Sequence, residues 1–270
     1  MKRFLTALGL TTFSFLAVAP LLWVVFTSVK PTNEIFISPF APPSKLAWEN
    51  YSNAMSEAHI GLYIRNSLIS TVLSLAILLP VAAMAAYVLA KYKFRGNKFL
   101  QTLFTAGMMF PNFLAAVPLF LLLGKLNMLN SLTGLVVAYV AYSLSFSIFV
   151  LQGFFAQLPD ELGEAAMMDG CGHHATFWKV MLPLAKPGLV VTGIFNAIGL
   201  WNEYNLAKVL LQGDFQTLPL GLANLTMSQQ YKNDTGALFA ALTITMIPLL
   251  ILYWLVKDRI QEAMLAGSIK

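Results

Sequence analysis

The sequence predicts an all-α polytopic membrane protein with six transmembrane helices. Charged residues make up 11% of its 270 residues and apolar residues 58%, whereas about 25% of a typical soluble domain is charged. The mean hydropathy is +0.70, and the charges gather in short clusters between long uncharged runs. A soluble enzyme, a disordered chain and a nucleic-acid-binding protein are therefore excluded, and the net charge of +5 points to membrane topology.

Six runs are long enough to cross a bilayer, because a helix needs about 20 apolar residues to span roughly 30 Å of hydrocarbon. They cover residues 4–29, 66–90, 99–124, 131–154, 187–211 and 235–256, and only the fifth contains charges, at Glu203 and Lys208. The first run contains Ala17-Val18-Ala19, as a secretory signal would, but Pro20 comes next and the run continues to Val29. We therefore expect an uncleaved first span and one transmembrane domain over residues 1–270.

The Lys and Arg residues indicate the orientation, because cytoplasmic loops carry an excess of them. With a cytoplasmic N-terminus, the inner segments hold Lys2, Arg3, Lys91, Lys93, Arg95, Lys98, Lys179, Lys186, Lys257, Arg259 and Lys270. The outer segments hold fewer, namely Lys30, Lys45, Arg65, Lys125, Lys208 and Lys232. Both termini are therefore expected in the cytoplasm.

A long cytoplasmic connection, about residues 155–186, carries the most specific pattern. It is expected to begin with a short helix that has Pro159 at its first position and Asp160 and Glu161 near the positive end of the helix dipole. Gly170 is able to take the left-handed conformation that ends a helix. One narrow face of this helix carries mostly small side chains, which allow close approach to another surface; it consists of Leu162, Ala165, Ala166 and Asp169.

The spacing within this connection matches a known motif. Glu164-Ala165-Ala166 is followed by Gly170, then by the aliphatic Val180 and by Leu182-Pro183. This spacing resembles the EAA loop of ABC-importer permeases. The chain is also similar to one branch of that family, the maltose-permease-G-like carbohydrate permeases, for example at Trp201-Asn202-Glu203-Tyr204 and at Thr217-Leu218-Pro219-Leu220-Gly221-Leu222.

The resemblance implies the fold of a type I importer permease, a place in the bacterial inner membrane and a role in sugar import. A second homologous permease as heterodimer partner, two ABC ATPase subunits and an extracytoplasmic solute-binding protein would complete the transporter, surrounded by lipid. The chain itself would bind no cofactor, since ATP and Mg²⁺ would belong to the ATPase subunits and the sequence has no Gly-x4-Gly-Lys-Ser/Thr loop. The residues that would couple it to the ATPase are Glu164, Ala165, Ala166, Asp169, Gly170, Val180, Leu182 and Pro183.

Polar residues within the predicted spans are candidates for a translocation path or a contact with the partner permease. On the fifth span, Glu203 either faces the path or the partner, or lies as a solvated acid at the membrane surface. Close helix packing in lipid is the favoured explanation for the hydroxyl groups of the fourth span, with the path as the alternative. The candidates are Thr192, Asn196, Gly199 and Glu203 on the fifth span and Tyr139, Ser143 and Ser147 on the fourth.

Other site chemistries find less support. His173 and His174 are adjacent, so their side chains diverge, and a surface pair is favoured over a zinc site. Cys171 is the only cysteine, which excludes a disulfide framework. The alternative functions are an importer of glycerol-phosphate-type solutes in the same family, a secondary transporter or a channel. A secondary transporter would be expected to carry paired intramembrane charges, and only Glu203 is available as an acid.

The charge distribution generates a test of topology. Single cysteines introduced in the Arg95 loop, at the C-terminus, near Asn50 and near Asp214, in a chain whose Cys171 is replaced by Ser, are exposed to a membrane-impermeant thiol reagent in intact cells. We expect labelling of the cysteines near Asn50 and Asp214, and none in the Arg95 loop or at the C-terminus until the membrane is permeabilised. Labelling of the Arg95 loop from outside would show that the orientation is reversed.

Overall fold

The computed structural model describes residues 2–56, 59–232 and 234–268. Every regular element in these ranges is helical, which confirms the predicted all-α class. The first elements are α1 (Lys2–Ser28), α2 (Thr32–Ile37), α3 (Glu49–Ser56), α4 (Ile60–Lys91), α5 (Asn97–Met109), α6 (Asn112–Lys125) and α7 (Leu132–Gln157). The later ones are α8 (Glu161–Met168), α9 (His173–Thr176), the π-helix η1 (Phe177–Met181), α10 (Leu182–Leu184), α11 (Lys186–Trp201), α12 (Asn205–Leu210), the 3₁₀ turn η2 (Gly213–Phe215), α13 (Leu218–Lys232) and α14 (Thr235–Ser268).

Four described helices are long and apolar enough to cross a membrane: α1, α4, α7 and α14. Two bent pairs raise this number to as many as six if each pair is one span. The pairs are α5 with α6, and the segment His173–Leu184 with α11. The chain therefore has four to six candidate spans, and the expectation of six lies within this range.

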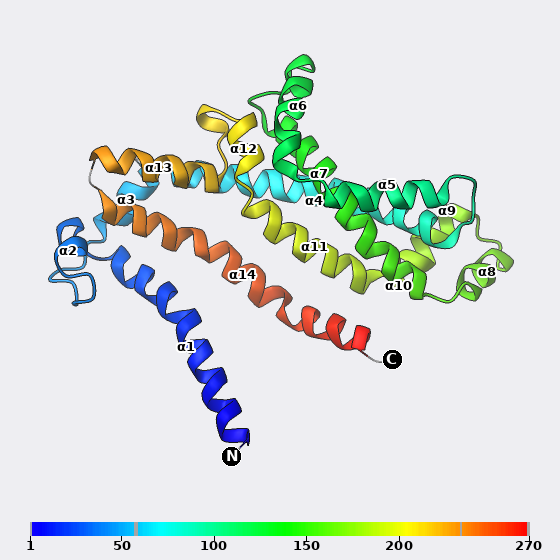
Figure 1. The fold of residues 1–270 in the computed structure, drawn as a ribbon, viewed down its shortest axis with the longest axis horizontal. Coiled ribbons are helices and arrows are strands. Elements are labelled where there is room, and N and C mark those ends of the chain that lie inside the picture. The colour runs from blue at the N-terminus through cyan, green and yellow to red at the C-terminus, as the bar shows by residue number, and fades with distance from the viewer. Residues whose placement is uncertain (1, 57–58, 233, 269–270) are drawn as a thin grey trace. The chain divides into compact units, whose positions relative to one another are not determined.

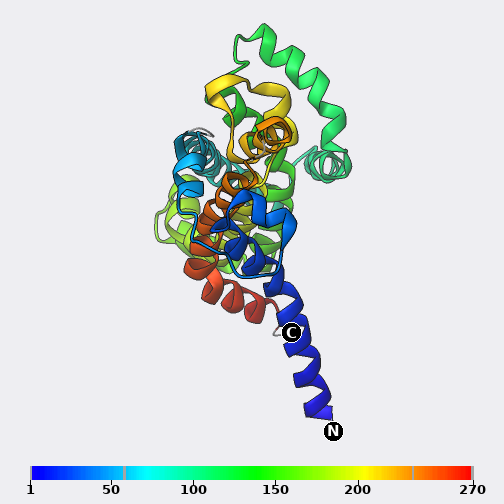
Figure 2. The same cartoon turned by 90° about the vertical axis from the view of Figure 1, so that its left-hand side faces the viewer.

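The sequence predicted one continuous helix over residues 99–124, and this prediction is wrong. α5 and α6 are bent by 107° to one another, and Figure 2 shows α6 turning sharply away from α5. The break lies at Phe110 and Pro111, which both have extended backbones, with ψ of 124° and 117°. Proline supplies no N–H and disfavours a helical conformation in the residue before it. Pro111 therefore lies between two helices and interrupts the run.

The chain divides into two compact units, of which the first comprises Met1–Ile64 and Leu218–Ile251. Hydrogen bonds from two polar side chains stabilise the loops between its helices. The buried Lys30 donates from Nζ to the carbonyl oxygens of Ser38 (2.6 Å) and Ala41 (2.7 Å). Asp234 caps α14 by accepting from the backbone N–H of Ala237 (3.0 Å), and the Asn53 amide donates to its other carboxylate oxygen (3.1 Å).

The second unit comprises Arg65–Thr217 and Leu252–Lys270. Within it α7 lies against α5 and α11 (Figure 1). A buried cluster joins three elements: an alanine-rich face of α4, the C-terminal half of α7, and η1. Small residues let helices approach closely in lipid. The cluster consists of Leu78, Ala82, Ala83, Ala86, Tyr87, Leu89, Ile148, Leu151, Phe155, Phe177, Met181 and Ala185.

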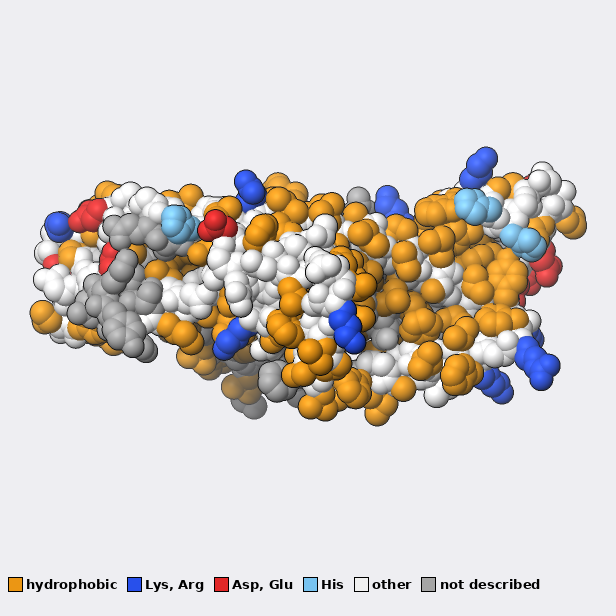
Figure 3. Space-filling model, turned by 90° about the horizontal axis from the view of Figure 1, so that it is seen from above, with side chains coloured by type: hydrophobic (Ala, Val, Ile, Leu, Met, Phe, Trp, Pro, Cys, Tyr) orange, Lys and Arg blue, Asp and Glu red, His pale blue; other side chains and the backbone are white. Residues whose placement is uncertain are grey.

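Large apolar side chains cover much of the surface, as Figure 3 shows for one face. Along α1 they include Phe4, Phe13 and Phe15, whose side chains are 70%, 72% and 71% exposed. A contiguous apolar surface of this extent is unfavourable in water and stable in lipid or against another membrane subunit. The surface therefore agrees with a chain that resides in a membrane.

Candidate functional site

The short helix α8 and the turn after it form an exposed projection of the second unit. Glu164, Ala165 and Asp169 are exposed on it, whereas Gly163 and Ala166 face the rest of the unit and are buried. The four residues that the sequence placed on one face are therefore divided, because Ala166 lies on the inward side. Gly170 has a φ of +87°, so the predicted left-handed residue at the end of the helix is confirmed.

The start of α8 differs from the sequence-based expectation. The helix begins at Glu161 and Pro159 lies outside it, with Asp160 as the N-terminal cap residue. The Asp160 carboxylate makes no capping bond because it forms an ion pair with Lys91, the last residue of α4, at 2.6 Å. Lys91 also donates to the carbonyl oxygen of Leu158. A lysine counted in the sequence only as a topology signal thus fixes the base of α8.

This ion pair has an electrostatic consequence for the exposed carboxylate. The hydrogen bond from Lys91, and then its positive charge, hold the pKa of the Asp160 carboxyl below its ordinary value. Because the folded-state pKa is lowered, the stabilisation from the pair is present above the ordinary pKa of an aspartate. It is lost as the pH falls through the lowered value.

The π-helix η1 joins α8 and α9 to the long helices. Phe177 and Met181 are buried in the central cluster, and the Phe177 ring lies 5.2 Å from that of Tyr87 on α4. Val180 and Leu182 are partly buried against the same cluster, and Pro183 is exposed. Pro183 has no N–H to donate to the carbonyl four residues before it, which favours the wider π register. No pattern in the sequence indicated this π-helix, a form frequent at functional sites.

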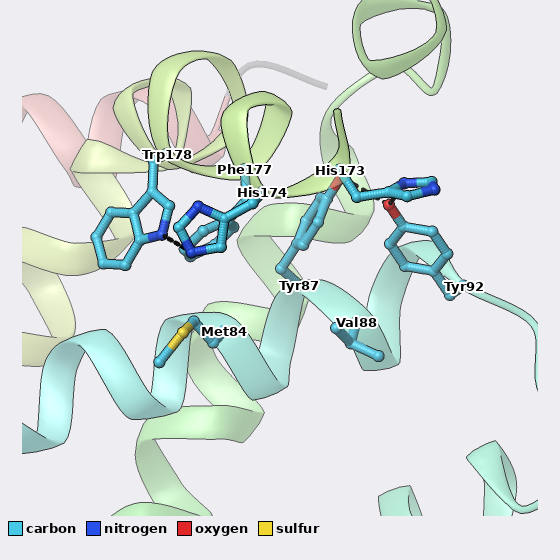
Figure 4. A pocket seen from close by; sticks show the side chains of 8 residues that line it. All are labelled: Met84, Tyr87, Val88, Tyr92, His173, His174, Phe177 and Trp178. Atoms are coloured by element: carbon cyan, nitrogen blue, oxygen red, sulfur yellow. Dashed lines mark hydrogen bonds between the residues drawn. The ribbon is translucent and has the colours of Figure 1, made fainter. Parts of the chain in front are cut away.

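An apolar pocket of about 550 Å³ lies beside η1, between α4 and α9. Figure 4 shows its lining, in which the side chains of His173 and His174 point in different directions. His173 Nδ1 lies 3.1 Å from the Tyr92 hydroxyl, and Trp178 Nε1 donates to His174 Nε2 at 3.2 Å. Within the described residues no three His, Cys, Asp or Glu side chains converge on a metal position. The full lining is Met84, Tyr87, Val88, Tyr92, His173, His174, Phe177 and Trp178.

The candidate path residues fall into two places. Ser143, Asn196 and Gly199 line one cavity of about 320 Å³ between α5, α7 and α11. Tyr139 and Ser147 are fully buried at 0% exposure and do not line it, which agrees with the packing explanation for that face of α7. The cavity side of α7 is the neighbouring face, with Tyr142, Ser145 and Phe146. Their i, i+3, i+4 spacing was a signal in the sequence that went unused.

Glu203 has a structural role that neither alternative described. The helix expected over 187–211 ends at Trp201, and Glu203 lies in the break before α12. Its carboxylate accepts from the backbone N–H groups of Leu206 (2.7 Å) and Ala207 (3.1 Å). The buried Tyr139 hydroxyl donates to its Oε2 at 3.0 Å. Glu203 therefore holds the first turn of α12 and ties it to α7, since an anion at a helix N-terminus is stabilising.

Comparison with known proteins identifies relatives over most of the chain. Residues 78–265 match the family described as binding-protein-dependent transport system inner membrane component. The diacetylchitobiose uptake system permease protein NgcG of Streptomyces coelicolor is 42% identical over 258 residues, covering 95% of this chain and 85% of that protein. The trehalose transport system permease protein SugB of Mycobacterium tuberculosis is 31% identical over 255 residues, covering 94% and 93%.

A solved structure shares the fold. It is a bacterial ABC transporter involved in the import of the acidic polysaccharide alginate, and one of its chains matches with a TM-score of 0.81. The match covers 95% of both chains at 23% sequence identity. The described helices therefore have the fold of an ABC-importer membrane subunit.

The Glu203 geometry leads to a prediction about stability. In Glu203→Leu, two backbone N–H groups and the Tyr139 hydroxyl lose their acceptor, at about 1–3 kcal/mol for each group left buried and unsatisfied. Glu203→Gln keeps one acceptor oxygen and should lose less. We expect the thermal midpoint of the purified protein in detergent to fall in the order wild type, Glu203→Gln, Glu203→Leu.

Glu49→Leu is the matched control, because that exposed carboxylate makes a surface ion pair with Lys45 and such pairs contribute little. A Glu203→Leu protein as stable as this control would show that the carboxylate does not hold α12.

Proposed function

Because this chain belongs to the inner-membrane components of binding-protein-dependent transport systems, we propose that it imports a neutral sugar or oligosaccharide as one half of a two-permease translocation path. A solute-binding protein delivers the sugar from outside, and two cytoplasmic ATPase subunits supply the energy. The observation that carries the proposal is the projection of α8 on a buried base, within a chain whose relatives include sugar-uptake permeases. Six spans with both termini in the cytoplasm complete the proposal.

Two relatives support a neutral sugar as the substrate. NgcG is named for diacetylchitobiose and SugB for trehalose, and both are uncharged disaccharides. The cavity shared by Ser143, Asn196 and Gly199 contains no charged side chain among its lining residues. This favours a neutral solute over a phosphorylated one, for which a basic group would be expected.

The coupling role is assigned to α8 and the turn after it. Glu164, Ala165 and Asp169 face outward and are available to an ATPase subunit, while Gly170 makes the turn. Ala166 packs inward and supports the helix from behind. Val180, Leu182 and Pro183 belong to the segment that connects this projection to the membrane helices.

Motion of α8 has a short route to the long helices. Two links carry it: the Lys91–Asp160 ion pair to the end of α4, and Phe177 and Met181 within the cluster formed with α4 and α7. A closely packed cluster transmits displacement because it has few voids to absorb it. Closure of the ATPase dimer would therefore shift α4 and α7 together. ATP and Mg²⁺ are bound by the ATPase subunits, and this chain contributes no residue to that chemistry.

The test is sugar uptake into proteoliposomes that contain this chain with its partner permease, the ATPase subunits and the binding protein. We expect uptake of diacetylchitobiose or trehalose that requires both ATP and the binding protein. Uptake that continues without ATP would identify a passive or ion-coupled transporter instead. Uptake of a sugar phosphate with no uptake of either disaccharide would contradict the neutral-sugar assignment.

The turn at Gly170 provides a second prediction, with a control two residues away. Gly170 has a positive φ, whereas Gly172 has a φ of −70°, and a Cβ would meet nothing within 4 Å at either position. Valine at position 170 is strained by about 1–2 kcal/mol, and valine at position 172 is not. We expect Gly170→Val to reduce ATP-driven uptake and binding-protein-stimulated ATP hydrolysis several-fold, with Gly172→Val near wild type. Equal activity of the two variants would remove the α8 turn from the coupling role.

A further inference from the structure

The cavity between α5, α7 and α11 has the composition of a small-molecule site. It lies entirely within the second compact unit and measures about 320 Å³, at the lower end of the roughly 300–1,000 Å³ of ligand pockets. Its lining is Gly107, Met108, Tyr142, Ser143, Ser145, Phe146, Phe195, Asn196, Gly199 and Leu200. We propose that it is a binding subsite for one neutral sugar ring on the translocation path, an inference that rests on the proposed function.

Three aromatic side chains supply flat surfaces for the sugar. Phe146 and Phe195 form a T-shaped pair with ring centroids 6.2 Å apart, and Tyr142 lines the same cavity from α7. Phe195 and Tyr142 remain 61% and 43% exposed, so their faces are open to a ligand. The axial C–H groups of a pyranose carry partial positive charge and pack on the negative face of an aromatic ring.

Asn196 supplies a fixed polar group. The residue is 6% exposed, and its Nδ2 donates to Ser147 Oγ (3.0 Å) and to the Thr192 carbonyl oxygen (2.8 Å). These two bonds use both amide hydrogens and orient the carboxamide. No described residue donates to its Oδ1. An acceptor oriented in this way, on a mostly buried residue that lines the cavity, is suited to a sugar hydroxyl.

Ser145 supplies the second polar group, and two glycines make the room. Ser145 Oγ forms no hydrogen bond with another described residue. It lies close to α5, because a Cβ on Gly107 would be 2.6 Å from it. Gly107 thus allows the hydroxyl to lie against α5 at the cavity wall. A Cβ on Gly199 would meet nothing within 4 Å, so a side chain there would extend into open space at the cavity.

The aromatic and polar lining of the cavity fits a sugar better than it fits other ligands. A lipid chain needs no oriented amide, and an ion would need charge or several convergent oxygens. No lining residue is charged, so an anionic solute gains nothing here. Aromatic faces combined with uncharged hydrogen-bonding groups match a molecule that has both C–H faces and hydroxyls.

Thiol protection provides a direct test that does not depend on turnover. Ser145→Cys is made in a Cys171→Ser chain and assembled with the partner permease and ATPase subunits. We expect a small methanethiosulfonate reagent to label position 145, and diacetylchitobiose, or whichever disaccharide the transporter takes up, to slow labelling several-fold. A disaccharide that is not transported should give no protection.

Cavity filling provides the functional arm. Gly199→Leu should raise the KM for uptake by about tenfold or more at matched amounts of assembled complex. Gly153→Leu on α7 is the control, because Gly153 is also exposed, has nothing within 4 Å of a Cβ, and does not line the cavity. Its KM should equal that of wild type.

Three results would overturn the subsite. They are ATP-driven uptake without any sugar protection of position 145, a Gly199→Leu KM equal to that of Gly153→Leu, and a thiol that reacts in this chain alone but is shielded by the partner permease without sugar. The last would identify partner side chains as the occupant. Each of these leaves the proposed function intact, whereas the absence of any ATP-dependent sugar uptake would contradict the proposed function itself.

Discussion

The packing of Phe177 and Met181 between α4 and α7 is the contact on which the rest of the site depends. It attaches a short, mostly exposed segment to two long apolar helices. The alanines of α4 make this possible because they leave room for the Phe177 and Tyr87 rings to meet. The other attachments of α8 are weaker: the two buried small residues Gly163 and Ala166, and the bonds of Lys91 to Asp160 and Leu158 at its base, and exposed ion pairs contribute little to stability. The contact therefore packs a mostly exposed segment against the long helices of the bundle.

Backbone hydrogen bonding explains the second feature of the bundle, its broken helices. In hydrocarbon every backbone polar group needs a partner within the protein, so a helix can end inside a span only where other groups take over. At the end of α11 the Glu203 carboxylate does this for Leu206 and Ala207, and Tyr139 fixes the carboxylate in turn. In the loop between α6 and α7, the Asn130 side chain accepts from the backbone N–H of Gln212, which lies in the connection after α12. Irregular segments thus occur where side chains of neighbouring helices meet them.

The sequence was sufficient for the class, the long helices and the turn at Gly170, because these depend on local features such as apolar length, backbone freedom and motif spacing. It was insufficient where a residue's role depends on a distant partner. Lys91 and Asp160 are 69 residues apart, so their ion pair left no local pattern. Which face of α7 meets the cavity also depends on where α5 and α11 pack. As a result Tyr142 and Ser145 line the cavity, whereas Tyr139 is fully buried. Periodicity defines a helix's faces, but only its neighbours decide which one is open.

The hydrogen bonds of Asp234 determine when the first unit can be completed during synthesis of the chain. Lys30 finds its carbonyl partners within 8 to 11 residues, so that loop can close as soon as it leaves the ribosome, since short loops cost little entropy to close. Asp234 is joined to Asn53 across 181 residues and to Thr32 across 202. The first unit therefore stays open through most of synthesis and is completed by the chain's last helix. A ribosome that stops before α14 would release a protein whose first and last thirds never meet, with polar groups exposed for proteolytic quality control to recognise.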